Sequence, residues 1–163
     1  MTPPIGTIGV YGWTLDSFLD ALRVANVGVV LDVRQRRGVR GSEYAWANST
    51  RLQKALAEAD VEYRHHPELA PTTELREVQY AVDEKRGVGK RSRDELAPEY
   101  RHRYIAEILD RADLAAVFDG LPSDAAAVLL CVERDPEACH RSLIAERLAG
   151  QGRSVFHLRP EKE

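Results

Sequence analysis

The chain of 163 residues has a formal net charge of −3, with 44% hydrophobic and 30% charged residues, which is the composition of an ordinary globular protein. The sequence contains no run of about 18 apolar residues, so it predicts no membrane span. The N-terminus lacks the basic and long apolar regions of a secretory signal. The length predicts a single domain over residues 1–163. Two cysteines are too few for a disulfide scaffold, so we expect the protein in the cytoplasm, without a membrane partner.

The N-terminal part of the chain predicts a strand, a helix and a second strand. Thr7–Tyr11 is β-branched and aromatic and ends at Gly12, which is typical of a strand and its turn. Thr14 is the kind of residue that caps a helix. Val27–Val33 is an almost continuous apolar run, typical of a strand covered on both faces. A helix between the two strands is predicted by the spacing of the apolar residues Leu15, Phe18, Leu19 and Leu22. The three elements predict a right-handed βαβ unit.

The middle of the chain begins with an arginine-rich loop, Arg34–Ser42. A helix is predicted from about Thr50 to Ala59, and a third strand over Val61–His65. The segment Leu69–Pro98 is interrupted by glycines and prolines. We expect a helix near Glu74–Glu84 in it, followed by a mobile or ligand-gated loop.

The C-terminal part again alternates between strands and helices. It predicts a helix at Tyr100–Leu109, a strand at Ala126–Val132, an exposed loop at Glu133–Ala138, a helix at Ser142–Ala149 and a strand at Ser154–Leu158. This alternation predicts a three-layer α/β/α sandwich, Rossmann-like, with a mainly parallel sheet of about five strands.

Polar residues gather where the predicted strands end. Because parallel strands bring their carboxyl ends to one edge of a sheet, we expect these residues to share a site. They are Gly9, Tyr11, Gly12, Asp32, Arg34, His65, Glu133, Cys139, His140 and Arg141.

Cys139 is the candidate nucleophile, because a helix N-terminus and the neighbouring His140 and Arg141 would lower the pKa of its thiol. The alternative is a small side chain that fills a tight loop. Cys131 is interpreted as a core residue of the fourth strand. Seven residues separate the two cysteines, unlike the spacing of zinc knuckles, so no metal is predicted.

An anionic ligand is the favoured partner of this site. Arg34 and Arg141 would hold the anion, while Asp32, Glu133 and His140 would handle protons. Asp32 and Arg34 could equally form an ion pair that fixes the loop. Gly9 and Gly12, with Tyr11 between them, would allow close backbone approach, and His65 would line the site. The chain has no GxGxxG or Walker sequence, so no nucleotide cofactor is predicted.

Two basic loops support a competing function. Residues 34–40 and 85–93 are rich in arginine and lysine, and Arg36, Arg37 and Arg40 lie near Trp46, a combination found in nucleic-acid grooves. The sequence therefore favours an enzyme that acts on a small phosphate- or nucleotide-like anion, with Cys139 as nucleophile. The alternatives are a nucleic-acid-associated protein and a non-catalytic sensing or partner-binding module. The oligomeric state is left open.

The chain also resembles the DUF488 family of bacterial and archaeal proteins. The resemblance rests on the block Cys131, Glu133, Cys139, His140 and Arg141, on TIG at Thr7–Gly9, on LDVR at Leu31–Arg34, and on Tyr63 with His65. The family usually has TIGHS where this chain has TIGVY, and a glycine-rich turn where this chain has Leu69-Ala70-Pro71. The resemblance implies an α/β fold and a shared site, but no particular reaction.

Overall fold

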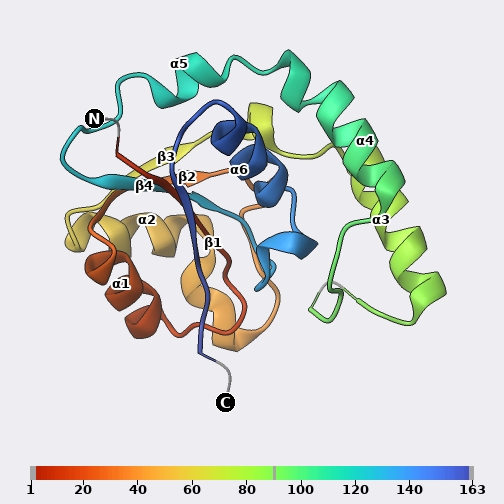
Figure 1. The fold of residues 1–163 in the computed structure, drawn as a ribbon. Coiled ribbons are helices and arrows are strands. Elements are labelled where there is room, and N and C mark those ends of the chain that lie inside the picture. The colour runs from red at the N-terminus through yellow and green to blue at the C-terminus, as the bar shows by residue number, and fades with distance from the viewer. Residues whose placement is uncertain (1–2, 90, 162–163) are drawn as a thin grey trace.

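A computed structural model describes residues 3–89 and 91–161, which form a five-stranded parallel sheet flanked by helices (Figure 1). The strand order is β3-β2-β4-β1-β5, and every pairing is parallel. The strands are β1 (Ile5–Ile8), β2 (Val27–Asp32), β3 (Glu62–His65), β4 (Ala126–Leu130) and β5 (Val155–Leu158). The predicted α/β fold with its parallel sheet is confirmed.

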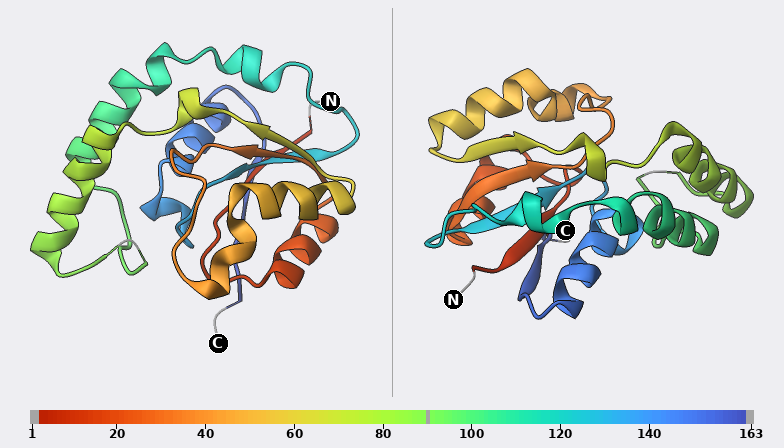
Figure 2. Two further views of the ribbon diagram at one scale, coloured as in Figure 1. Left: turned by 180° about the vertical axis from the view of Figure 1, so that it is seen from behind. Right: turned by 90° about the horizontal axis from the view of Figure 1, so that it is seen from above.

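The helices divide between the two faces of the sheet as right-handed crossovers require. The connections β1→β2→β3 run in one direction along the sheet, and β4→β5 runs in the other. Accordingly, α1 and α2 lie on one face and α6 on the opposite one (Figure 2). The helices α3 and α4 pack on each other beside the sheet. Their bounds are α1 (Leu15–Val24), α2 (Ser49–Glu58), α3 (Thr73–Arg86), α4 (Pro98–Glu107), α5 (Leu114–Phe118) and α6 (Arg141–Gly150).

The core lies between these layers, around the three central strands. Every residue of β1 and β4 is buried, as strands covered on both faces should be. Thr14 caps α1 as predicted, since its hydroxyl accepts a hydrogen bond from the Ser17 amide. The sequence did not predict the short helix α5, whose five residues are too few for a periodic pattern. In the part of the chain that the structure describes, no helix is long and apolar enough to cross a membrane.

Two predicted strands end earlier than their apolar runs. β1 stops at Ile8 rather than Tyr11, because the amides of Val10 and Tyr11 both donate to the carbonyl of Val132 and turn the chain away from the ladder. β4 stops at Leu130 rather than Val132. Both apolar runs therefore continue into the loops at the carboxyl edge of the sheet.

The prediction of an exposed loop at Glu133–Ala138 was wrong for half of the loop. Glu133, Pro136 and Ala138 are all buried. Two arginines account for the difference, because Arg141 donates to the Glu133 carbonyl at 2.7 Å and Arg93 to its carboxylate at 2.7 Å. Of the charged residues in this loop, Glu133 is buried together with its partner, whereas Arg134 and Asp135 are half-buried and Glu137 is exposed.

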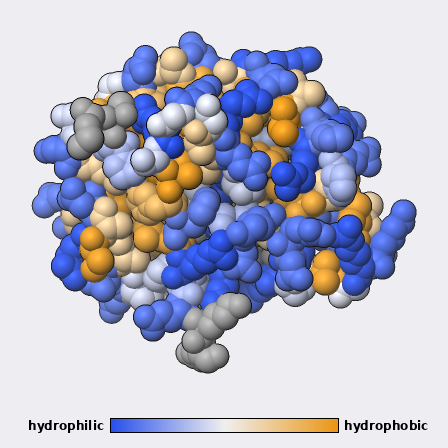
Figure 3. Space-filling model, viewed as in Figure 1, coloured by the Kyte–Doolittle hydropathy of each residue, from blue (hydrophilic) through white to orange (hydrophobic). Residues whose placement is uncertain are grey.

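The sheet has its topological switch at β4. This strand lies between β2 and β1, whose following helices pack on the face opposite to α6. Loops that leave neighbouring strands toward opposite faces separate, and the crevice between them is where open α/β sheets bind ligands. Hydrophilic side chains cover much of the molecule on the face shown in Figure 3, especially over α3 and α4.

Candidate functional site

A pocket of about 640 Å³ opens at the carboxyl ends of β1, β2 and β4. Its walls come from the loops after these strands, from α3, and from the segment that joins α3 to α4. The residues of its floor and inner wall include Tyr11, Arg34, Arg93, Tyr100, Cys131, Glu133, Cys139 and His140. The sequence predicted that residues from separate strand ends converge, and five of these eight were predicted as site residues: Tyr11, Arg34, Glu133, Cys139 and His140.

Two cysteines and a histidine form a compact cluster on the pocket floor. Cys131 follows β4, Cys139 ends a short turn, and His140 precedes α6. Both sulfurs lie 3.7 Å from Nδ1 of His140, and all three ligand-type atoms lie within 4.8 Å of one another. Cys131 is thus both a core residue, as predicted, and a member of the site.

The hydrogen bond on the far side of His140 fixes its tautomer. Nε2 lies 2.9 Å from the carbonyl oxygen of Val33, which can only accept a hydrogen bond. Nε2 therefore carries a proton, and Nδ1 faces the two sulfurs. In this orientation Nδ1 can take a proton from a thiol or, when protonated, donate one to a thiolate.

The electrostatics of the cluster favour a thiolate on Cys139. Burial alone would raise the pKa of this thiol, but hydrogen bonding with Cys131 and the positive charges of His140 and Arg141 hold its pKa well below the ordinary value. Burial, together with the neighbouring Cys139 and Glu133, raises the pKa of Cys131. Burial would lower the pKa of His140, but the Cys139 charge raises it. These directions favour a thiolate on Cys139, a proton on His140 and a neutral thiol on Cys131.

The same three side chains are of the kinds that bind zinc. Two thiolates and an imidazole form the protein part of several catalytic zinc sites, in which the fourth position stays open. Cys131, Cys139 and His140 could therefore hold a metal ion. The prediction that no metal binds remains a prediction.

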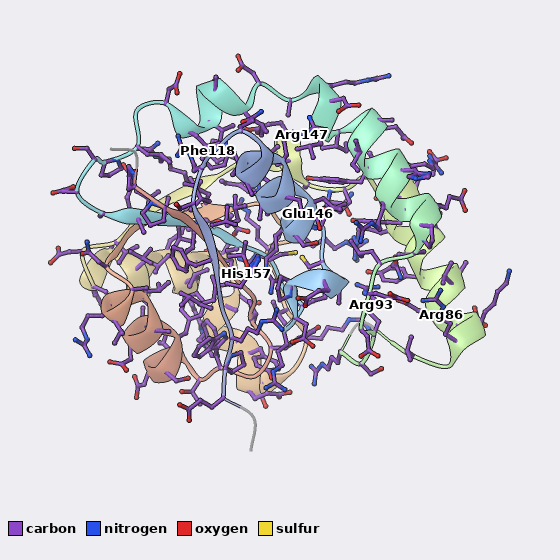
Figure 4. The ribbon with its side chains drawn as sticks, in the orientation of Figure 1. Arg86, Arg93, Phe118, Glu146, Arg147 and His157 are labelled. Atoms are coloured by element: carbon purple, nitrogen blue, oxygen red, sulfur yellow. The ribbon has the colours of Figure 1, made fainter. Side chains whose placement is uncertain are left out.

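Glu133 is held in a buried network on the wall of the pocket. Its Oε2 lies 3.5 Å from the sulfur of Cys131, and its Oε1 accepts a hydrogen bond from Arg93 at 2.7 Å. Arg93 also donates to Asp83 of α3 at 2.6 Å and to the Ala138 carbonyl at 3.1 Å. Arg93 therefore ties the α3–α4 connection to the loop before α6, as Figure 4 shows. Nothing in the sequence indicates that one arginine of the basic stretch 85–93 is buried.

Asp32 and Arg34 form a buried ion pair behind the pocket. Asp32 accepts two hydrogen bonds from the Arg34 guanidinium, at 2.9 and 2.8 Å, and a third from the Tyr63 hydroxyl at 2.5 Å. The remaining terminal nitrogen of Arg34 donates to the Ala47 carbonyl. Asp32 is not among the residues that line the pocket. This geometry matches the structural alternative for the pair, while its role in ligand binding remains a prediction.

Arg141 and Gly9 hold the loop after β4 rather than lining the pocket. The Arg141 guanidinium donates to the carbonyls of Glu133 and Arg134, at 2.7 and 3.1 Å. A Cβ on Gly9 would lie 1.9 Å from the Glu133 carbonyl oxygen, so only glycine permits this approach. The sequence predicted close backbone approach at Gly9, and its neighbour is the protein's own loop.

The rim of the pocket carries arginines that lack carboxylate partners. Among the described residues, the guanidinium groups of Arg36 and Arg40 have no hydrogen bond or ion pair, and Arg76 bonds only to Gln35 and Tyr80. Arg91 stacks over the ring of Tyr11 at 4.9 Å and forms an exposed ion pair with Glu43. The rim is therefore positively charged and open to an anion.

Other predicted residues lie outside the pocket lining. Gly12 has a positive φ of 93° and donates its amide to Tyr44, and His65 contacts the Arg34 carbonyl at 3.3 Å. Trp46 packs against Phe18, with ring centroids 4.9 Å apart, and Arg37 donates to Tyr63. Lys90 of the second basic loop lies outside the described residues. Nucleic-acid binding remains a prediction of the sequence.

The protein is thus of the α/β class, with an all-parallel sheet and a cluster of two cysteines and a histidine at the switch point of the sheet. The family described as "Domain of unknown function DUF488" matches residues 14–148, and the chain belongs to this family. The match includes the whole cluster and its loop. No curated protein and no solved structure shows a significant match to the chain.

Proposed function

We propose that this protein is an enzyme that binds a small phosphate- or nucleotide-like anion in the pocket and attacks it with the Cys139 thiolate. The observation that carries the proposal is the pair formed by Cys139 and His140 on the floor of an arginine-rimmed pocket. The free thiols suit a reducing compartment, and we place the protein in the cytoplasm.

The anion site is assigned to the rim. Arg36, Arg40 and Arg76 line the pocket and have no carboxylate partner among the described residues, so their charge is available to a ligand. Arg34 and Arg141, by contrast, already use guanidinium nitrogens on Asp32 and on backbone carbonyls. They would therefore support the site from behind.

The chemistry follows from the two ends of the His140 ring. The Cys139 lone pair forms a bond to the electrophilic centre of the ligand, and the bond to the leaving group breaks with its electron pair. The His140 imidazolium supplies the Nδ1 proton to that leaving group, while its bond to Val33 keeps the ring in place. Water then attacks the covalent intermediate, Nδ1 of the now neutral His140 accepts the water proton, and the bond to sulfur breaks with its electron pair, which restores the Cys139 thiolate. Glu133 would orient the cluster through Cys131.

The test measures the alkylation of Cys139 by iodoacetamide as a function of pH, with each cysteine followed by mass spectrometry and EDTA present throughout. We expect Cys139 to react with a midpoint below the value of about 8.5 for an ordinary thiol. Cys131, whose pKa is raised, serves as the internal control in the same molecule. Reaction of Cys139 only near or above the ordinary midpoint would contradict the proposal.

The anion site is tested in the same assay with inorganic pyrophosphate as the probe. Pyrophosphate should slow the alkylation of Cys139, and the double variant Arg36→Gln/Arg76→Gln should lose this protection. Arg51→Gln is the matched control, because Arg51 is exposed on α2, lies outside the pocket lining, and forms no hydrogen bond or ion pair with the described residues. Equal protection of all three proteins would refute the assignment of the rim.

A further inference from the structure

The pocket floor holds a second sulfur for which the proposed reaction has no direct use. Cys131 and Cys139 stand at the two ends of the loop that joins β4 to α6, and this loop folds back so that their sulfurs lie within 4.8 Å of each other. Both cysteines are free. Because a disulfide needs an S–S distance of about 2.05 Å, a modest approach of two side chains would join them.

We propose that Cys139 and Cys131 form a reversible disulfide when the protein meets hydrogen peroxide, which makes Cys139 a site of oxidation and Cys131 its resolving partner. The inference rests on the same Cys139 thiolate as the proposed function. It adds a role for Cys131, and it means that an oxidant would inactivate the Cys139 nucleophile by converting it to a disulfide.

The two sulfurs differ in the way that this division of roles requires. Peroxide reacts with thiolates, and Nδ1 of His140, 3.7 Å from the Cys139 sulfur, is placed to stabilise one there, in agreement with the lowered pKa of this thiol. Cys131 remains a thiol because burial and its neighbours raise its pKa. Both sulfurs belong to residues that line the pocket, so a molecule as small as hydrogen peroxide can reach them.

The first step oxidises Cys139. The thiolate attacks one peroxide oxygen, the O–O bond breaks, and the hydroxide that leaves takes the Nδ1 proton of the His140 imidazolium to become water. The sulfur is oxidised to a sulfenic acid while the peroxide is reduced. His140 is now neutral, with Nδ1 free to accept a proton.

The second step forms the disulfide. Nδ1 of His140, which lies 3.7 Å from the Cys131 sulfur, accepts the thiol proton. The Cys131 thiolate then attacks the Cys139 sulfur, the S–O bond breaks, and the hydroxide takes the same proton to leave as water. One peroxide is consumed, two waters form, and a thiol such as dithiothreitol reverses the reaction by exchange.

The experiment exposes the reduced wild-type protein to equimolar hydrogen peroxide with EDTA present, blocks remaining thiols with N-ethylmaleimide and digests with trypsin. Trypsin cleaves after Arg134, which lies between the cysteines, so the disulfide joins two separate peptides. We expect this linked pair, its loss with dithiothreitol, and a decrease of about tenfold or more in Cys139 alkylation after oxidation. Cys131→Ser should give no linked pair and a sulfenic acid on Cys139 that dimedone traps.

Other outcomes separate the two proposals. Fast alkylation of Cys139 in the reduced protein without a linked pair after peroxide overturns the disulfide and leaves the nucleophile intact. A linked pair in a protein whose Cys139 alkylates slowly supports the disulfide and overturns the proposed function. A stable sulfinic acid on Cys139 beside a free Cys131 overturns the role of Cys131 as resolving partner.

Discussion

At the scale of single residues, His140 connects the loops that follow two different strands. Its Nε2 donates to Val33 after β2, and its Nδ1 faces both sulfurs. The positive charge of its ring is one cause of the lowered pKa of Cys139. The orientation of the ring therefore links the end of one strand to the reactivity of a thiol that follows another.

Replacing His140 should change the pH at which Cys139 reacts. In His140→Asn the imidazolium is gone, and the pKa of Cys139 should rise, as expected when a nearby opposite charge is removed. Alkylation of Cys139 at neutral pH should slow because the thiolate fraction falls. The measurement is the alkylation midpoint of the folded variant. An unchanged midpoint would mean that His140 has only a packing role.

At the scale of elements, Arg93 fastens the α3–α4 connection to the loop before α6. Its guanidinium contacts carboxylates from both sides, Asp83 and Glu133, and all three side chains are at most 7% exposed. Arg86, seven positions earlier in the same region, forms only a half-exposed ion pair with Glu95 at 3.5 Å. The two arginines are thus a natural pair for comparison (Figure 4).

Removing each arginine should have very different effects on stability. Arg93→Gln leaves two buried carboxylates without their partner and should lower the free energy of unfolding by about 3–5 kcal/mol. Arg86→Gln removes an exposed pair and should cost about 1 kcal/mol or less. Urea denaturation at neutral pH measures both. Equal losses in the two variants would show that Arg93 is not the fastening residue.

At the scale of the whole molecule, ligand binding should increase the thermal stability of the folded protein. A ligand that binds only the folded protein stabilises it by about 2.7 kcal/mol at a concentration one hundred times its Kd. For a chain of this size that corresponds to a rise in Tm of about 5–10 °C. We expect pyrophosphate to raise Tm, and sodium chloride at equal ionic strength to have little effect. The same rise in Arg36→Gln/Arg76→Gln would contradict the anion site.

The sequence was sufficient to predict the sheet, because its three central strands are buried on both faces and produce apolar runs such as Val27–Val33. The same burial misled the prediction of strand ends, since Val10 and Val132 are apolar but serve the turns beyond the ladder. Apolar residues indicate which positions are buried, but they do not indicate where the hydrogen bonds of a strand end.

The candidate site was only partly accessible from the sequence. Cys139, His140 and Glu133 could be placed because they follow a strand and open a helix. Arg93 could not, since its partner Glu133 lies 40 residues further along the chain and nothing distinguishes Arg93 from exposed arginines nearby. Charge alone does not tell whether a guanidinium faces water or a buried carboxylate.

The position of β4 in the sheet has a consequence for how the protein is made. β1 and β2 are not neighbours: β4 lies between them, and Ile5 pairs with Ala127. During synthesis the first half of the chain therefore has no complete sheet in which to bury its strands until β4 leaves the ribosome. Such long-range pairing slows folding. Because Cys131 follows β4 directly, the Cys131, Cys139 and His140 cluster is completed only when the centre of the sheet closes, and a nascent chain that stops short of residue 130 has no such cluster.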